Sequence, residues 1–129
     1  MKQLIVGVGL LLAGSPAFAS QLAAGPLASG KINGGPAQNH IACYIFNNGT
    51  KAVKLSAKSI AGNDGSNVLT DDRCGSKLGS GVGCVLFAPS VSPSQPYDCA
   101  VTASPSTDVR GSIESRSAAG AVLANQALR

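Results

Sequence analysis

The sequence predicts an all-β protein, an antiparallel β-sandwich of seven or eight short strands, on three observations. No stretch sustains an apolar period of 3.6 residues, so helices are not expected. Short runs of alternating apolar and polar residues recur instead, with turn signals about every 8 to 12 residues. The chain is also poor in large apolar residues and contains four cysteines, which is typical of small exported domains stabilised by disulfides. A small closed β-barrel is the competing fold.

The N-terminal segment, residues 1–19, is typical of a secretory signal peptide. Lys2 gives a positive start, residues 4–14 are apolar and uncharged, and residues 17–19 are of the kind that a signal peptidase reads. The apolar run is shorter than the roughly 20 residues needed to cross a bilayer, and no Cys follows that would carry a lipid anchor. We therefore predict cleavage between Ala19 and Ser20, with export to a periplasm or to the extracellular space.

Cleavage at this position would leave one domain, residues 20–129. Because Lys2 is removed with the signal peptide, nine of the ten Lys and Arg remain, against six Asp and Glu. This mild positive balance contains no dense basic run, which argues against a nucleic-acid partner. Leu, Ile, Val and Phe together provide only about a fifth of the domain, close to the limit below which chains do not fold alone. A core this thin is expected to depend on covalent cross-links.

The first half of the domain alternates between strands and turns. Residues 20–30 are rich in Ala, Gly and Ser and predict a flexible leader, and the sandwich is expected over residues 31–129. Its opening weak strand ends in a turn at Lys31–Pro36. The next strand, His40–Asn47, is apolar on both faces and should be central. An Asn-Gly pair at Asn47–Thr50 then predicts a hairpin.

Residues 53–58 alternate cleanly, which predicts a strand with Val53, Leu55 and Ala57 directed inward and a wet outer face. This strand should end at a turn over residues 61–65, before a short strand at Asn67–Thr70. The segment Asp71–Gly83 is rich in Gly and Ser and is expected to be a loop.

Four further strands complete the predicted sandwich. Between the first two of them, Pro89–Pro96 contains three Pro and three Ser, which suits a crossing from one sheet to the other and favours a sandwich over a barrel. The last two are expected to form a hairpin around residues 118–120. The expected strands are Cys84–Ala88, Tyr97–Ala103, Val109–Arg116 and Ala121–Leu128.

The motif Tyr97-Asp98-Cys99 resembles immunoglobulin-like domains, in which a Tyr two residues before the second bridging Cys closes a sheet connection. The resemblance implies Cys43 on the second strand as the partner of Cys99. The chain has no Trp to pack on such a bridge, so the resemblance implies the sandwich architecture alone. The wider pattern over Ile41–Arg116 is similar to small exported bacterial proteins that form a family of unknown function.

Four cysteines allow three pairings, of which we favour Cys43–Cys99 with Cys74–Cys84. The pairing Cys43–Cys84 is the rival, because it would join strands that are neighbours in many sandwiches. A cysteine metal site is not expected, since the spacing is not C-x-x-C and export favours oxidation.

Catalytic and metal-binding residues are not expected. His40 is the single histidine, too few for copper–zinc or blue-copper chemistry, and no nucleophile-elbow motif accompanies it. Asp64, Asp71 and Asp72 lack the ligand spacing of a calcium loop and are predicted to be solvated loop residues. No cofactor is therefore predicted, and we expect a protein that is not an enzyme.

The leading hypothesis is an exported, non-enzymatic binding or structural module whose partner is an envelope or extracellular protein or glycan, without a membrane anchor. The candidate contact loops are Ala61–Ser66 and Pro89–Pro96. Arg110, Glu114 and Arg116 would form a polar stripe on the last sheet, which is interpreted as an ordinary wet face. The alternative is a secreted inhibitor of a hydrolase that inserts the loop between Cys74 and Cys84. A pilus-type subunit is a third possibility.

Overall fold

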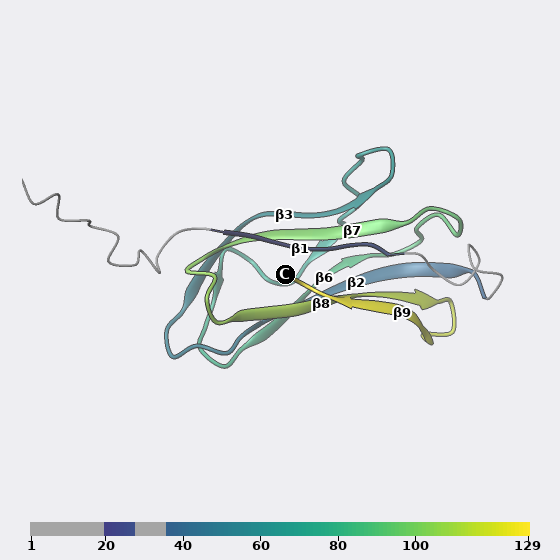
Figure 1. Ribbon diagram of the computed structural model, residues 1–129. Helices are drawn as coiled ribbons and strands as arrows, with labels where there is room; N and C mark the ends of the chain where they lie inside the picture. The colour runs from purple at the N-terminus through teal and green to yellow at the C-terminus, as the bar shows by residue number, and fades with distance from the viewer. Residues whose placement is uncertain (1–19, 28–35) are drawn as a thin grey trace, which may run out of the picture.

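The computed structural model describes residues 20–27 and 36–129. Within these residues the chain contains no helix and folds as two antiparallel sheets packed face to face (Figure 1). The two sheets are separate, so the fold is the predicted sandwich and not the barrel alternative. The predicted signal peptide at residues 1–19 and most of the predicted turn at residues 31–36 lie outside the described residues.

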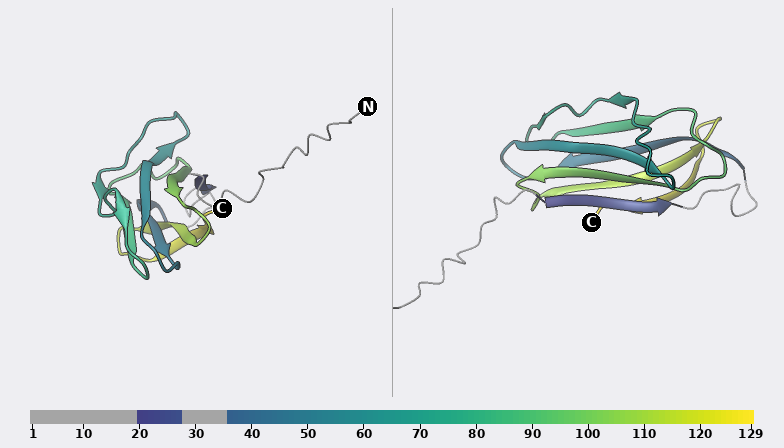
Figure 2. Two further views of the ribbon diagram at one scale, coloured as in Figure 1. Left: turned by 90° about the vertical axis from the view of Figure 1, so that its left-hand side faces the viewer. Right: turned by 90° about the horizontal axis from the view of Figure 1, so that it is seen from above.

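The four-stranded sheet has the order β1-β7-β3-β5 and the five-stranded sheet the order β4-β6-β2-β8-β9. Figure 2 shows these two layers from two further directions. The strands are β1 (Ser20–Leu27), β2 (Gln38–Asn47), β3 (Val53–Gly62), β4 (Asp71–Asp72), β5 (Lys77–Leu78), β6 (Gly83–Ala88), β7 (Tyr97–Ser104), β8 (Val109–Ser117) and β9 (Val122–Ala127).

Strand β2 is the middle of the five-stranded sheet, paired with β6 on one side and β8 on the other. Ile41, Cys43 and Ile45 point into the sandwich and are buried. The alternate residues Tyr44 and Phe46 point outward and are partly exposed. The prediction of a central strand with two largely apolar faces is therefore confirmed.

Strand β7 is the corresponding strand of the opposite sheet, between β1 and β3. Tyr97, Cys99, Val101 and Ala103 all point inward and are buried, as their alternation predicts. At the start of the strand the Tyr97 hydroxyl accepts a hydrogen bond from the backbone N–H of Ser92 at 2.9 Å. This is the corner that the tyrosine position predicts, and it fastens the proline-rich crossing to the sandwich.

A disulfide between Cys43 and Cys99 joins the centres of the two sheets, with a Cα–Cα distance of 6.3 Å. Both residues have no solvent exposure. The second disulfide, Cys74–Cys84, ties the segment that carries β4 and β5 to the start of β6. No cysteine is free, so the favoured pairing is confirmed and the rival pairing is wrong.

The inner strands follow the order of an immunoglobulin sandwich, whereas the flanking strands are exchanged. In that fold the first strand lies in the sheet of the first bridging Cys and the last strand in the sheet of the second. Here the first strand, β1, pairs with β7, and β8 pairs with β2. No local sequence signal distinguishes these two arrangements, because both place an antiparallel partner beside each bridged strand.

The prediction of a flexible leader over residues 20–30 is wrong for the part that the structure describes, since Ser20–Leu27 forms β1. Ala24 and Leu27 are buried in the core. The backbone of β1 pairs with β7 along one edge, and on the other edge Ala23 exchanges two hydrogen bonds with Arg129, at 2.8 and 2.9 Å. Backbone pairing of this kind does not depend on side-chain type, so an Ala-rich composition did not reveal it.

The predicted hairpin at Asn47–Thr50 is also wrong, because β2 and β3 lie in different sheets. The Asn47 side chain is buried and shapes the crossing instead. Its amide nitrogen donates to the carbonyl oxygens of Lys51 and Leu78, at 2.7 and 3.1 Å, while its oxygen accepts from the Gly49 N–H at 2.9 Å. The Asn-Gly pair is therefore part of a connection between sheets.

The alternation of β3 holds at Val53 and Leu55 and then fails at Ala57, which is exposed with a φ of 48°. A register shift between Ser56 and Ser59 lets the strand return to the core at Ile60. This bulge also turns Lys58 toward the 71–78 segment.

The segment after β3 differs from the prediction in two places. The short strand expected at Asn67–Thr70 is reduced to a single bridge between Ala61 and Asn67. The loop expected at Asp71–Gly83 contains the two-residue strands β4 and β5. Four other predicted elements are found at the expected positions: the turn at residues 61–65, strand β6, the crossing at residues 89–96 and the final hairpin.

Candidate functional site

The outward surface of the five-stranded sheet, which we call the outer face, brings several apolar side chains of the described structure to solvent. Tyr44 and Phe46 of β2 remain 39% and 41% exposed there. On the neighbouring strand β6, Val85 lies opposite Tyr44, and Phe87 lies opposite Ala42 on the same face of the sheet. The strand pairing thus collects four large apolar residues on the solvent side of one sheet, although the core lies on its other side.

Two adjoining hollows occupy this outer face. The larger, called the aromatic hollow, has a volume of about 660 Å³, and the second has about 270 Å³. They share Tyr44, Arg73 and Val85, so they form one continuous depression. The aromatic hollow is lined by Tyr44, Ile45, Phe46, Arg73, Gly83, Cys84, Val85, Arg110, Gly111 and Ser112.

Two glycines flank β2 in the lining of the aromatic hollow. Gly83 of β6 lies opposite Phe46, and a Cβ there would come within 3.4 Å of the phenyl ring, so the absence of a side chain leaves this ring accessible. Gly111 of β8 lies opposite the inward-pointing Ile45, and a Cβ there would approach the Tyr44 carbonyl oxygen to 2.1 Å. Only glycine therefore permits β8 to approach β2 this closely.

Arginines provide the charge around the aromatic hollow, and none of its ten lining residues is a carboxylate. Arg73 pairs with Asp71 at 2.8 Å, but its side chain remains 68% exposed. Arg110 donates to the carbonyl oxygens of Thr107 and Val109, each at 2.9 Å. Among the described residues Arg110 has no ion-pair partner, so its positive charge is not compensated locally.

The stripe predicted from Arg110, Glu114 and Arg116 does lie on the outer face, since these residues pair with Phe46, Ala42 and His40. Arg116 donates to the Glu114 carboxylate at 2.7 and 3.0 Å and to the Gly120 carbonyl at 3.0 Å. The hydrogen bond with Glu114, with a smaller effect of the Tyr44 phenol, raises the pKa of Arg116.

His40 packs its ring against Phe87, with ring centroids 5.1 Å apart. Burial first and the nearby Arg116 charge second lower the pKa of His40, which favours the neutral imidazole. No second histidine exists in the chain to join it in a metal or catalytic pair. His40 therefore lies at the border of the outer face, where its ring packs against the apolar side chain of Phe87.

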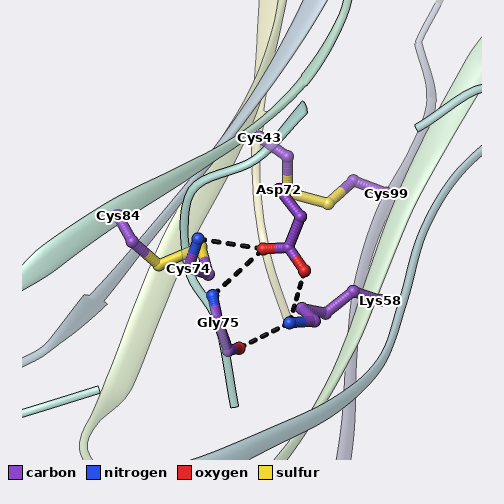
Figure 3. The surroundings of a disulfide bond; sticks show 7 residues. All are labelled: Cys43, Lys58, Asp72, Cys74, Gly75, Cys84 and Cys99. Carbon is purple, nitrogen blue, oxygen red and sulfur yellow. Dashed lines mark hydrogen bonds and ion pairs between the residues drawn. A yellow bond between two sulfur atoms is a disulfide. The ribbon is translucent and has the colours of Figure 1, made fainter. Parts of the chain in front are cut away.

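The three aspartates singled out in the sequence are dispersed and engaged by protein groups. Asp71 pairs with Arg73, and Asp64 accepts hydrogen bonds from the Ser66 N–H and hydroxyl. Asp72 accepts from the Cys74 and Gly75 N–H groups and pairs with Lys58, as Figure 3 shows. No group of metal-binding side chains occurs within residues 20–27 and 36–129.

The segment between Cys74 and Cys84, expected to act as an insertion loop in an inhibitor, is fastened to the body of the sandwich. Lys58 donates to the Gly75 carbonyl as well as pairing with Asp72 (Figure 3). Leu78 is buried in the core, and β5 pairs with β3. The disulfide thus closes a segment that is bonded to the sandwich through Lys58 and through the pairing of β5 with β3.

The predicted contact loops at residues 61–66 and 89–96 meet at one end of the molecule. Gln95 lies against Asp64 across the two loops. Beneath them the buried amide of Gln38 donates to the carbonyl oxygens of Ser92 and Gln95 at 2.6 and 2.5 Å. Ser115 in turn donates to Gln38 at 2.9 Å, so the crossing loop is anchored from inside the sandwich.

Sequence reasoning missed the aromatic hollow. The apolar outer side of the His40–Asn47 strand indicates a central strand but does not by itself indicate a binding surface. The remaining signals were Gly83 and Gly111 beside that strand, and Arg73, which reaches the hollow from the segment expected to be a loop.

No protein-family model matches the chain, and no curated protein or solved structure matches it either. Among the described residues there is no helix that is long and apolar enough to cross a membrane.

Proposed function

We propose that the protein is an exported, non-enzymatic binding module that holds its partner on the outer face of the five-stranded sheet. The observation that carries the proposal is the aromatic hollow, in which partly exposed Tyr44 and Phe46 lie beside Arg73 and Arg110. Binding sites are typically concave and rich in aromatic and arginine side chains, because these residues provide a large contact area and directed hydrogen bonds.

Export is part of the proposal and is supported from two directions. Residues 1–19 have the three-part pattern of a signal peptide. The two disulfides suggest an oxidising environment, because reducing compartments keep thiols free. A periplasmic or an extracellular location satisfies both observations.

The rigid sandwich suits a binding role. The sheet-to-sheet disulfide and the buried Asn47 and Gln38 fix the strands behind the outer face. A preformed surface loses little conformational entropy on association, which favours affinity. The chain offers one histidine and no free thiol for chemistry, so we assign it no reaction.

Expression of the full chain in a bacterial host, followed by fractionation and intact mass measurement, tests the export part. We expect a product beginning at Ser20, with both disulfides formed, outside the cytoplasm. Retention of residues 1–19 in a cytoplasmic product would contradict export.

Co-sedimentation with isolated envelopes and extracellular polymers tests the binding part. Phe46→Ser should reduce retention, whereas Val122→Ser, at an equally exposed apolar residue of β9 outside both hollows, should not. Equal retention of both variants and the parent protein would refute the two hollows of the outer face as the binding surface.

A further inference from the structure

We infer that the outer face takes an acidic polysaccharide, a linear chain of sugar rings bearing carboxylates. This inference rests on the binding role proposed above and names the chemical class of the partner. The shape, the apolar surface and the charge of the two hollows each favour this class of ligand.

The depression is elongated and open. The second hollow continues the aromatic hollow past Tyr44 toward Ala42 and Phe87, on the same side of the sheet. An enclosed cavity would select a small molecule that it could surround. A depression that runs over several residues of one sheet face suits a section of a longer chain.

The surface of the depression is largely apolar and carries aromatic rings on which a sugar ring can pack. The C–H face of a pyranose ring packs on aromatic side chains, and Tyr44 and Phe46 present partly exposed rings on successive outward positions of β2. Hydroxyl groups also line the larger hollow, at Tyr44 and Ser112. They can exchange hydrogen bonds with sugar hydroxyls.

The charge selects an acidic ligand. Arg73 and Arg110 line the aromatic hollow with no carboxylate among its lining residues. A guanidinium binds a carboxylate through two parallel hydrogen bonds, a geometry that lysine cannot match. Arg110 is available for this contact, because its partners among the described residues are two backbone carbonyls.

The backbone at this place disfavours an extended peptide as the ligand. Peptides that add a strand need an unpaired sheet edge. Strand β2 is paired on both sides, with β6 and β8, so the centre of the outer face has no free backbone groups to offer. Recognition here must use side chains.

Isothermal titration with a hexamer of galacturonate tests the inference, with the methyl-esterified hexamer as the matched uncharged ligand. The purified protein should bind the acid form about tenfold more tightly than the ester. Arg110→Gln should weaken binding of the acid form about fivefold. Phe46→Ser should weaken binding of both forms about tenfold. Lys54→Gln removes the same charge from an exposed position on β3, in the other sheet, and should leave the affinity for the hexamer unchanged.

Four results would overturn the acidic-polysaccharide inference. Equal affinity for the acid and the ester would show that the carboxylates are not recognised. Equal or tighter binding of an oligophosphate of the same charge would show attraction to any polyanion. Absence of hexamer binding, while Phe46→Ser still lowers retention on envelope or extracellular polymers, would reject the ligand class but keep the proposed function. If Phe46→Ser changes neither measurement, both the ligand class and the proposed function fail.

Discussion

Removal of the Cys43–Cys99 disulfide should cost more stability than any other single change in this domain. The bridge closes a chain separation of 56 residues, whereas Cys74–Cys84 closes one of 10. In the chain-entropy model, loops of these lengths correspond to about 4 and about 3 kcal/mol of stabilisation at 25 °C. The Cys43 and Cys99 side chains are also without solvent exposure, so their replacement by Ala leaves a cavity at the centre of the core.

The magnitude is decisive for a domain of this size, since small domains are stable by about 5–15 kcal/mol in total. Guanidinium unfolding followed by circular dichroism should give a much lower midpoint for Cys43→Ala/Cys99→Ala than for the matched variant Cys74→Ala/Cys84→Ala. Unfolding of the first variant without denaturant would agree with the expectation. If the first variant is as stable as the second, the account of two sheets held together by the buried bridge is refuted.

Three further changes have defined outcomes. Burial acts to raise the pKa of Asp72, but hydrogen bonds from Lys58 and from two backbone N–H groups outweigh it and hold the pKa below its ordinary value of 3.8. The resulting stabilisation is complete above that value and is lost as the pH falls through the folded-state pKa. Asp72→Asn should therefore cost about 1 kcal/mol at pH 7 and less at about pH 2, as urea titrations at both pH values would show; an equal cost at both would contradict the charge-based explanation. Gly111→Ala should lower the free energy of unfolding by about 1–3 kcal/mol, because a Cβ there would meet backbone at 2.1 Å. Gly79→Ala is the control in the same unfolding assay, since the nearest atom to its Cβ would be a side-chain carbon at 3.5 Å. Equal stability of the two alanine variants would contradict the close approach of β8 to β2. Tyr97→Phe removes the acceptor of the Ser92 N–H and should lower stability by about 1 kcal/mol without altering ligand binding, whereas a change in affinity alone would assign Tyr97 to the site.

The two cysteine strands at the centre of the sandwich were predictable from the sequence, to different degrees. Residues 97–103 alternate so strongly that their inward face, and hence the burial of Cys99, follows from a period of two. Residues 41–45 are apolar on both faces, which places the strand centrally but does not by itself say which face is buried. The Pro-rich segment at residues 89–96 also has a local cause, because Pro cannot continue a central strand.

The errors arose where a local signal has two tertiary outcomes. An Asn-Gly pair fits a hairpin and equally fits the crossing that the buried Asn47 side chain organises. The Ala-rich segment at residues 20–27 resembles a linker, but β7 and Arg129 offer its backbone partners on both edges. Neither partner can be identified from the segment itself.

The aromatic hollow could be anticipated only in part. Tyr44 and Phe46 follow from the alternation of β2, since the residues between them and beyond them point to the core. Arg73 reaches the hollow because Asp71 and Asp72 pair with β6, a contact between a two-residue strand and its neighbour. A sequence pattern of that length carries too little information to predict a pairing.

The most direct test of the outer face as the functional surface is an NMR titration of the isotope-labelled protein with a polymer fraction from the surface of the cell that produces it. We expect the backbone chemical shifts that change on titration to belong to residues of β2, β6 and β8, around Tyr44, Phe46 and Val85. Changes confined to the loops at residues 61–66 and 89–96 would contradict it and would transfer the binding site to that end of the sandwich.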